Sequence, residues 1–173
     1  MSFVASILIV LLAASVVQVK SNVLIDKQCG VTEAPSKCSK CANNKGASTT
    51  VDVIAAMLQC ADDDAHTLFP VVRTIIYDGN ASGSLKAAAG ICQTSLVSVF
   101  DHGKQARLQS SQGTLKTAAD STSSALLDLQ NCQSAFEAGS IPIPPPISSG
   151  LSNVEFDFYL AGQLLRYVII HKI

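Results

Sequence analysis

The stretch CGVTEAPSKCSKC, residues 29–41, places three cysteines within thirteen positions. Cys38 and Cys41 have the two-residue spacing that is typical of a metal or redox site. Cys29 and Cys38, with eight residues between them, are instead spaced for a disulfide that closes a short turn. The chain contains six cysteines, which allow fifteen pairings, so their number alone does not decide between these interpretations.

The N-terminus indicates the compartment in which the cysteines reside. Residues 4–19 are almost wholly apolar, and this run is shorter than the ~20 apolar residues of a comfortable membrane span. Val19 and Ser21 suit the −3 and −1 positions of a signal peptidase site. We therefore interpret residues 1–21 as a cleaved secretory signal, with an unusually short membrane anchor as the alternative. A secreted chain favours disulfides over metal ligands, and we expect no membrane association after cleavage.

The charge of the mature chain excludes some classes of partner. Removal of residues 1–21 takes away one charged residue, Lys20, and leaves 11 basic residues against 13 acidic ones, a net charge of −2. This balance does not predict nucleic-acid binding. About 150 remaining residues are enough for one domain with a sizeable core.

Four segments carry the spacing of three and four residues between apolar positions that is typical of a helix with one buried face. The expected stripes are Val51, Ile54, Leu58, Ala61, Ala65, Leu68, Val72 and Ile75; Leu85, Ala89, Cys92, Leu96 and Val99; Leu115, Ala118, Thr122, Ala125, Leu129, Cys132 and Phe136; and Leu151, Val154, Phe158, Ala161, Leu165 and Val168. Four such helices with short connections predict an all-α fold, an antiparallel up-down four-helix bundle.

The breaks between these segments follow from residue type. Residues 78–83 and residues 110–113 are rich in glycine, serine, aspartate and asparagine, and both are expected to be loops. Residues 139–150, GSIPIPPPISSG, form a proline-rich connector that we expect to be non-helical throughout.

The first long helix has recognisable start and break signals. Ser48 or Thr49 is expected to cap its N-terminus, and Asp52 stands where a capping box requires an acidic residue. Pro70 lies within the stripe and predicts a kink near residues 65–69.

Cys92 and Cys132 both fall on predicted core stripes, in the second and third long helices. A short loop folds these helices back on each other, so the two thiols are expected to face one another and to form a disulfide. A bridge that closes about 40 residues stabilises a fold by roughly 4 kcal/mol on the loop-entropy estimate.

No enzyme motif is present. Residues 79–83, GNASG, place the serine one position too late for a nucleophile elbow, and neither a zinc-protease helix motif nor a phosphate-binding glycine loop occurs. His66, His102 and His171 lie in separate segments and are interpreted as surface or partly buried residues. The sequence thus predicts a protein that is not an enzyme and has no catalytic residue and no cofactor.

Two acidic or sulfur-rich clusters suggest a cation site at first sight. The run of residues 62–64, three consecutive aspartates, is interpreted as a solvated helix face, because consecutive residues point in different directions. Zinc bound by Cys29, Cys38, Cys41 and Cys60 is the alternative to disulfides, and secretion argues against it. No metal is therefore expected.

Asn80-Ala81-Ser82 is a sequon for N-glycosylation in a predicted loop, so Asn80 is a candidate glycosylation site.

The segment SSALLDLQNC, residues 123–132, resembles the SAALTDAxTC stretch of the plant invertase and pectin methylesterase inhibitor family. The positions in register are Ser123, Ala125, Leu126, Asp128 and Cys132. The following QSAFE, residues 133–137, is similar to the family as well, and so are two cysteine pairs, one with eight residues between its members and one with about forty. The resemblance implies a secreted four-helix bundle over residues 48–173, preceded by a small helical hairpin over residues 22–47. It also implies the disulfides Cys29–Cys38 and Cys92–Cys132.

The family resemblance implies a function as an enzyme inhibitor in the plant cell wall, or apoplast. One group of members caps the pectin-binding cleft of pectin methylesterase with the second and third bundle helices, and this is the function we expect, through a monomer that forms a non-covalent 1:1 complex. The expected contacts are polar residues of those helices: Lys104, Gln105, Arg107, Lys116, Thr117, Asp120 and Ser124.

Two alternatives to this function stay open. The other group of family members blocks acid invertase of the cell wall or vacuole through a Pro-Lys-Phe motif at the start of the third helix. The matching positions here are Leu115-Lys116-Thr117, which keep only the lysine. A secreted helical binding protein without inhibitory activity is the third interpretation.

Cys41 and Cys60 are additional to the family pattern. An even number of cysteines in an oxidising compartment predicts that they form a third disulfide. This bridge ties the hairpin to the first long helix and stabilises the fold by roughly 3 kcal/mol on the loop-entropy estimate. Two buried free thiols are the alternative.

Overall fold

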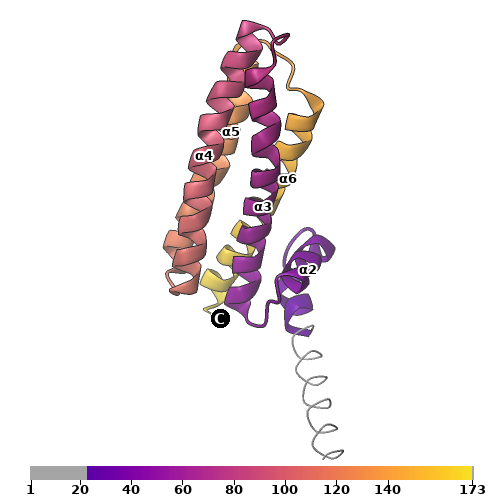
Figure 1. Cartoon of the computed structure of the whole chain (residues 1–173). Helices are drawn as coiled ribbons and strands as arrows, with labels where there is room; N and C mark the ends of the chain where they lie inside the picture. Colours follow the sequence, from indigo (N-terminus) through magenta and orange to yellow (C-terminus); the bar gives the residue numbers. More distant parts are fainter. Residues whose placement is uncertain (1–22, 173) are drawn as a thin grey trace, which may run out of the picture.

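The computed structural model describes residues 23–172. The expected signal peptide, residues 1–21, lies outside the described residues. All secondary-structure elements in the described part are helices, and they form the predicted four-helix bundle with a helical hairpin at its N-terminal end (Figure 1).

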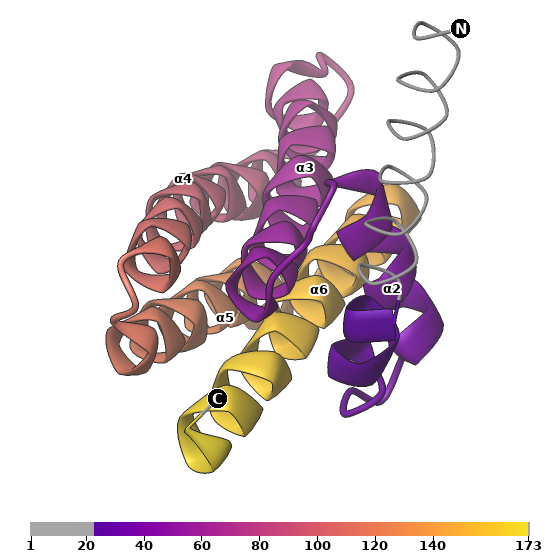
Figure 2. The same ribbon diagram turned by 90° about the horizontal axis from the view of Figure 1, so that it is seen from below.

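The bundle consists of four long helices that run up and down in sequence order. They are α3 (Thr50–Tyr77), α4 (Gly83–Ser111), α5 (Leu115–Ala138) and α6 (Pro145–His171). Each helix packs against the next one in the chain, and α6 closes the bundle by packing against α3 (Figure 2). The fold class predicted from the sequence is therefore confirmed.

The predicted apolar stripes form the core of the bundle. In α6 every residue of the stripe is buried, and in α3 only the two terminal positions of the stripe, Val51 and Ile75, are half-buried. Gly103 of α4 allows close packing at the centre, because a Cβ added there would lie 3.2 Å from the buried ring of Phe158 in α6. The periodicity of the sequence thus places the core of the bundle.

The N-terminus of α3 carries the predicted capping box. The Asp52 amide donates a hydrogen bond to Thr49 Oγ1 over 3.1 Å, and the Asp52 carboxylate accepts one from the Thr49 amide over 2.9 Å. Ser48 adds a hydroxyl hydrogen bond to the same carboxylate. These contacts satisfy N–H groups that have no partner within the helix. The helix continues through Pro70, and the predicted kink at residues 65–69 stays a prediction.

Two connections between helices are shorter in the structure than the sequence predicts. The first joins α4 to α5 and spans residues 112–114, with Gly113 in the left-handed region at φ +75°. The prediction that residues 139–150 are non-helical throughout was wrong, because α6 begins at Pro145. Proline fits the first turn of a helix, where its missing N–H has no acceptor in the helix and its fixed φ is already helical.

The hairpin consists of a helical segment at residues 23–29 and the helix α2 (Pro35–Asn44). The structure contains the disulfide Cys29–Cys38 between its two arms, with a Cα–Cα distance of 5.5 Å. Figure 2 shows the hairpin on the side of the bundle formed by α3 and α6, away from α4 and α5. The residue boundaries of the signal, hairpin and bundle stay predictions.

Two further disulfides have the predicted partners. Cys92–Cys132 joins α4 to α5, with a Cα–Cα distance of 4.0 Å. Cys41–Cys60 joins α2 to α3, with a Cα–Cα distance of 6.4 Å, and the described chain has no free cysteine. The three cysteines of residues 29–41 therefore all form disulfides, and none of them is a metal ligand.

Candidate functional site: a docking surface on α4 and α5

The seam between α4 and α5 is held by polar contacts as well as by a disulfide. His102 Nδ1 lies 2.8 Å from Asp128 Oδ2, which joins α4 to α5 at mid-height. Nearer the connecting turn, the hydroxyl of Ser121 donates a hydrogen bond over 2.8 Å to Oε1 of Gln109. Together with the Cys92–Cys132 bridge, these contacts fix the register of the two helices and hence the arrangement of their outer side chains.

The seven predicted contact residues belong to α4 and α5, and five of them are exposed. Lys104 and Gln105 of α4 are exposed, as are Lys116, Thr117 and Asp120 of α5. Ser124 is half-buried, and its hydroxyl donates to the Asp120 carbonyl over 3.1 Å, which leaves the oxygen as an acceptor. These six residues flank, in sequence, the turn at residues 112–114, which lies at one end of the bundle (Figure 1).

Arg107, the seventh predicted residue, points in another direction. Its guanidinium Nη2 lies 3.3 Å from Asp62 Oδ2 of α3. Asp62 is also 3.9 Å from Nε2 of His66, and the ring of His66 stacks on Phe100 with the centroids 4.3 Å apart. Arg107 thus belongs to a contact that joins α3 to α4, and it is separate from the outer side of the α4–α5 pair.

Three exposed apolar residues of α4 and α5 are absent from the predicted set. Val97 and Leu108 of α4 are 47% and 50% exposed, and Leu127 of α5 is 59% exposed. Val97 and Leu108 are eleven residues apart, which is three helical turns, so they lie on one face with Lys104 between them. The signal for them in the sequence is an apolar residue outside the buried stripe of its helix.

We call this surface the docking face. It consists of Val97, Lys104, Gln105, Leu108, Lys116, Thr117, Asp120, Ser124 and Leu127. Exposed aliphatic side chains among lysine, aspartate and hydroxyl groups are suited to protein contacts, since the apolar area drives association and the polar groups give orientation.

The start of α5 presents a lysine to solvent. Thr114 precedes the helix, and its hydroxyl donates to the Gln109 carbonyl over 3.0 Å, which holds the turn against the end of α4. Leu115, the first helical residue, is half-buried, whereas Lys116 and Thr117 are exposed. The position that corresponds to the Pro-Lys-Phe motif of invertase inhibitors therefore offers one basic side chain without flanking apolar ones at the surface.

The outer side of α5 and α6 carries a second concave region. Two hollows of about 330 Å³ and about 250 Å³ lie along it, and both are lined by Leu126 and Tyr159. The walls combine apolar side chains with a charged group in each hollow, Glu155 in the first and Arg166 in the second. Leu126 and Leu127 are neighbours in α5, so this region adjoins the docking face.

The hairpin is held against the bundle by a buried ionic cluster. Lys37 of α2 lies 2.5 Å from Oδ1 of Asp157 in α6, and its ammonium group is 5.0 Å from the ring centroid of Phe156. Burial raises the pKa of Asp157 to about 6, although the hydrogen bond and charge of Lys37 act in the opposite direction, and the nearby Asp64 carboxylate of α3 raises it further. The Glu33 amide also donates to Gln163 Oε1 over 3.1 Å.

The prediction that the aspartates at residues 62–64 form a solvated face was wrong for Asp62 and Asp64, which are half-buried, whereas Asp63 is exposed. Asp62 contacts Arg107 of α4, Asp63 forms an ion pair with Lys45 at the end of the hairpin, and Asp64 faces Asp157 of α6. Consecutive positions of a helix point about 100° apart, so each aspartate reaches a different neighbour. The acidic run thus connects α3 to the three elements packed around it.

The described residues contain no group of three or more histidine, cysteine, aspartate or glutamate side chains placed to hold a metal ion. Within residues 23–172, no helix is both long enough and apolar enough to cross a membrane.

These features define the class of protein as an up-down four-helix bundle with a docked N-terminal hairpin and three disulfides. The fold is that of pectin methylesterase inhibitors. A mutant form of an inhibitor from Arabidopsis superimposes with a TM-score of 0.68 at 17% identity, over 82% of this chain and 95% of that one. An inhibitor from Arabidopsis thaliana gives a TM-score of 0.63 at 18% identity, over 80% and 91% of the two chains. No family sequence profile and no curated protein sequence matches this chain.

Proposed function

We propose that this protein is a secreted inhibitor of pectin methylesterase, which binds the enzyme non-covalently over its pectin-binding cleft. The fold supports the proposal because the two structures compared above are pectin methylesterase inhibitors. The docking face supports the proposal at the level of residues, because it combines exposed Leu108 and Leu127 with charged and hydroxyl side chains.

The mechanism follows from the shape and chemistry of this face. Two long helices fixed by a disulfide present a rigid surface, so little conformational entropy is lost when the face binds. Apolar residues provide the desolvated centre of the contact, and Lys104, Lys116 and Asp120 provide charge complementarity at its edge. The inhibitor performs no chemistry in this mechanism, since a bundle seated over the cleft excludes the polymer.

Secretion is part of the proposal. Residues 1–21 direct export and are removed, residues 22–47 form the hairpin, and residues 48–173 form the bundle that acts in the cell wall as a monomer in a 1:1 complex. Three disulfides in the described chain support an oxidising, extracellular environment.

A side-by-side titration tests the proposed target. Purified protein with its disulfides intact is added to a fixed amount of a pectin methylesterase and, separately, of a cell-wall invertase. Loss of esterase activity that saturates at one inhibitor per enzyme is the expected result. Inhibition of invertase alone contradicts the proposed target, and inhibition of neither enzyme at micromolar protein supports a secreted helical binding protein instead.

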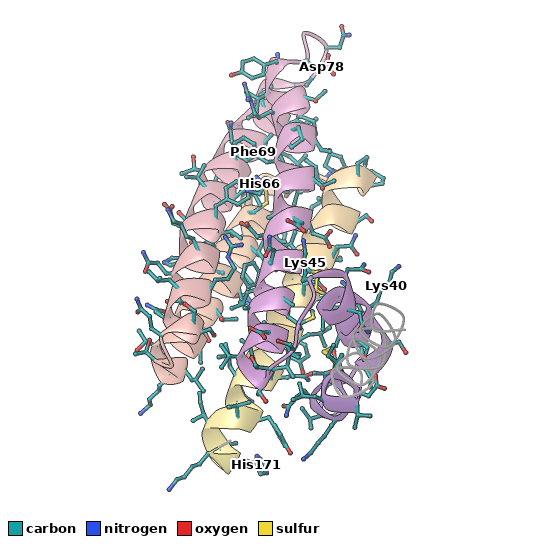
Figure 3. The ribbon with its side chains drawn as sticks, turned by 60° about the horizontal axis from the view of Figure 1, so that its bottom comes forward. Lys40, Lys45, His66, Phe69, Asp78 and His171 are labelled. Carbon is teal, nitrogen blue, oxygen red and sulfur yellow. A yellow bond between two sulfur atoms is a disulfide. The ribbon has the colours of Figure 1, made fainter. Side chains whose placement is uncertain are left out.

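A pair of charge-reversal variants tests the docking face. Lys104→Glu changes the face, whereas Lys40→Glu introduces the same charge change on the exposed side of the hairpin, away from α4 and α5 (Figure 3). Lys104→Glu is expected to weaken inhibition at least tenfold, which corresponds to about 1.4 kcal/mol, and Lys40→Glu to leave it unchanged. Equal inhibition constants for the two variants would exclude this face.

Invertase is the second candidate target, and one observation favours it. Lys116, the residue retained from the Pro-Lys-Phe motif, is exposed in the first turn of α5. Leu115 and Thr117 replace the proline and phenylalanine, so the apolar part of that motif is missing. If invertase is the target, Lys116→Ala should abolish its inhibition, and the same variant should reduce esterase inhibition only modestly if the esterase is the target.

A further inference from the structure

The turn between α3 and α4 presents an asparagine at the tip of the bundle. The helix α3 ends at Tyr77, and Asp78 accepts a hydrogen bond on its side-chain Oδ1 from the Asn80 amide over 2.9 Å. The Ala81 amide donates to the Asp78 carbonyl over 3.3 Å. Asp78, which Figure 3 labels at the tip far from the hairpin, and Asn80 are both exposed.

Ser82 has two roles in this turn. It is the N-cap of α4, where its hydroxyl accepts a hydrogen bond from the Leu85 amide over 3.2 Å. It is also the hydroxyl residue of the sequon Asn80-Ala81-Ser82, which oligosaccharide transfer to asparagine requires. Because the same hydroxyl serves the cap and the sequon, the two roles must be separated by choice of substitution.

A hollow adjoins the turn on the outer side of α3. It has a volume of about 540 Å³ and is lined by Pro70, Arg73, Thr74, Tyr77 and Asp78. The Tyr77 side chain is 73% exposed, and the Arg73 guanidinium lies over its ring at 5.7 Å from the centroid. Asp78 belongs both to the hollow and to the turn that holds Asn80, which follows it by two residues and whose backbone amide it binds.

We propose that Asn80 carries an N-linked glycan and that its first N-acetylglucosamine lies in this hollow, over the ring of Tyr77. In the transfer, Nδ2 of Asn80 forms a bond to the anomeric carbon of an oligosaccharide linked to a lipid pyrophosphate. The bond from that carbon to the pyrophosphate oxygen breaks, the lipid pyrophosphate leaves with the electron pair, and the amide nitrogen gives up one proton. The apolar face of a sugar ring suits an aromatic surface, and its hydroxyl groups suit Arg73 and Asp78. The proposal rests on the secretion included in the proposed function.

The glycan leaves the docking face free. Lys104 is 21 residues after Gly83, the first residue of α4, and therefore about 30 Å further along the helix axis at ~1.5 Å per residue. Figure 1 shows the α3–α4 turn at the opposite end of the bundle from the α4–α5 turn, which lies between Lys104 and Lys116 in the sequence. A glycan on Asn80 thus covers the exposed tyrosine at one end and leaves inhibition unaffected at the other.

Expression in a eukaryotic secretory host tests occupancy of the site. The secreted full chain should show a mass increase that peptide-N-glycosidase removes. Ser82→Thr keeps the sequon and the hydroxyl cap and should retain the glycan. Asn80→Gln keeps the cap and Ser82→Asp keeps a capping side chain, and both should lose the glycan while still folding. An unmodified Asn80 in the secreted wild-type protein overturns the proposal.

Exchange of the leader separates this proposal from the expected signal peptide. An established secretory signal replaces residues 1–21 in a second version of the chain. If only this second version is secreted and its Asn80 is modified, the glycan proposal holds and the assignment of residues 1–21 fails. If it is secreted with Asn80 unmodified, the glycan proposal fails, whatever the outcome of the inhibition assays.

Chemical acetylation of tyrosine tests the position of the sugar. Tyr77 should react several-fold more slowly in the glycosylated protein than in Asn80→Gln, whereas Tyr159 on α6, 44% exposed, provides an internal reference whose rate does not change. Equal rates at Tyr77 in the two proteins would show that the sugar does not cover the ring.

Discussion

Asp157 should make the protein less stable at neutral pH than at mildly acidic pH. The residue is 1% exposed, and burial raises its pKa from the ordinary value of 3.8 to about 6. Between these pH values the folded protein holds a proton that the unfolded chain has released, so the free energy of unfolding falls as the pH rises. Each pKa unit corresponds to about 1.4 kcal/mol, so the full effect is about 3 kcal/mol, present below pH 3.8 and lost above pH 6.

Asp157→Asn isolates this effect because an amide has no charge to bury. The free energy of unfolding of both proteins is measured by urea denaturation near pH 4 and near pH 7, with the disulfides intact. The wild-type protein should lose roughly 2 kcal/mol more than the variant over this range, because part of the full effect is already lost at pH 4. Lys37 is 35% exposed, so it can regain water when its carboxylate partner is removed, and the variant is expected to fold.

Asp63→Asn provides the matched control. It removes the other ion pair between the hairpin and the bundle, with Lys45, at a site where the carboxylate is half exposed. This variant should keep the pH dependence of the wild-type protein. If Asp157→Asn instead loses as much stability as the wild-type protein between the two pH values, the assignment of the effect to Asp157 is refuted.

The capping box of α3 limits how low the pH can be set if the effect of Asp157 is to be measured by itself. Burial raises the pKa of Asp52, but the hydrogen bonds from Ser48 and Thr49 outweigh it and lower the pKa overall. A lowered pKa stabilises the fold above the ordinary pKa and loses this contribution as the pH falls through the folded-state value. Measurements well below pH 4 would therefore combine two effects of opposite sign.

Two glycines of α4 should respond oppositely to substitution by alanine. Gly90→Ala should raise the free energy of unfolding by about 0.5–1 kcal/mol, because a Cβ there meets nothing within 4 Å. Gly103→Ala should lower it by about 1 kcal/mol, because the new Cβ must displace the buried ring of Phe158. Urea denaturation measures both, and stabilisation by Gly103→Ala would contradict the close packing. Replacement of Cys41 and Cys60 by alanine should lower the free energy of unfolding by about 3 kcal/mol and increase hydrogen exchange in α2, and an unchanged exchange rate would show that the bridge does not hold the hairpin.

The bundle could be predicted from the sequence because its determinants are local or periodic. A stripe such as Leu151 to Val168 specifies both the helix and its buried face, and the signals at Thr49 and Asp52 mark a helix start within four residues. The start of α6 could not be predicted in this way. Pro145 and Pro146 suit either a first helical turn or an extended connector, and the choice depends on Ile147, which is buried by the tertiary fold.

The polar contacts could not be predicted from the sequence pattern. Lys37 and Asp157 are far apart in the chain, and their types alone predict two solvated residues. The same holds for the aspartates of α3, whose partners come from three different elements. Arg107 and Lys104 are both basic and three positions apart, yet one points to α3 and the other to solvent, because the packing of α4 against α3 and α5 decides which side is covered.

The distribution of these contacts separates stability from recognition in this fold. The disulfides, the Asp157 cluster and the core stripes hold the hairpin and the four helices in place without using the side chains of the docking face. Residues such as Leu108 and Lys104 can therefore change with little effect on stability, since exposed substitutions away from special features usually cost less than about 0.5 kcal/mol. A bundle at 17% identity to an inhibitor of known structure can keep the same backbone while its outer residues differ. Under the proposed function, variants of the docking face should therefore alter inhibition and leave the unfolding free energy nearly unchanged.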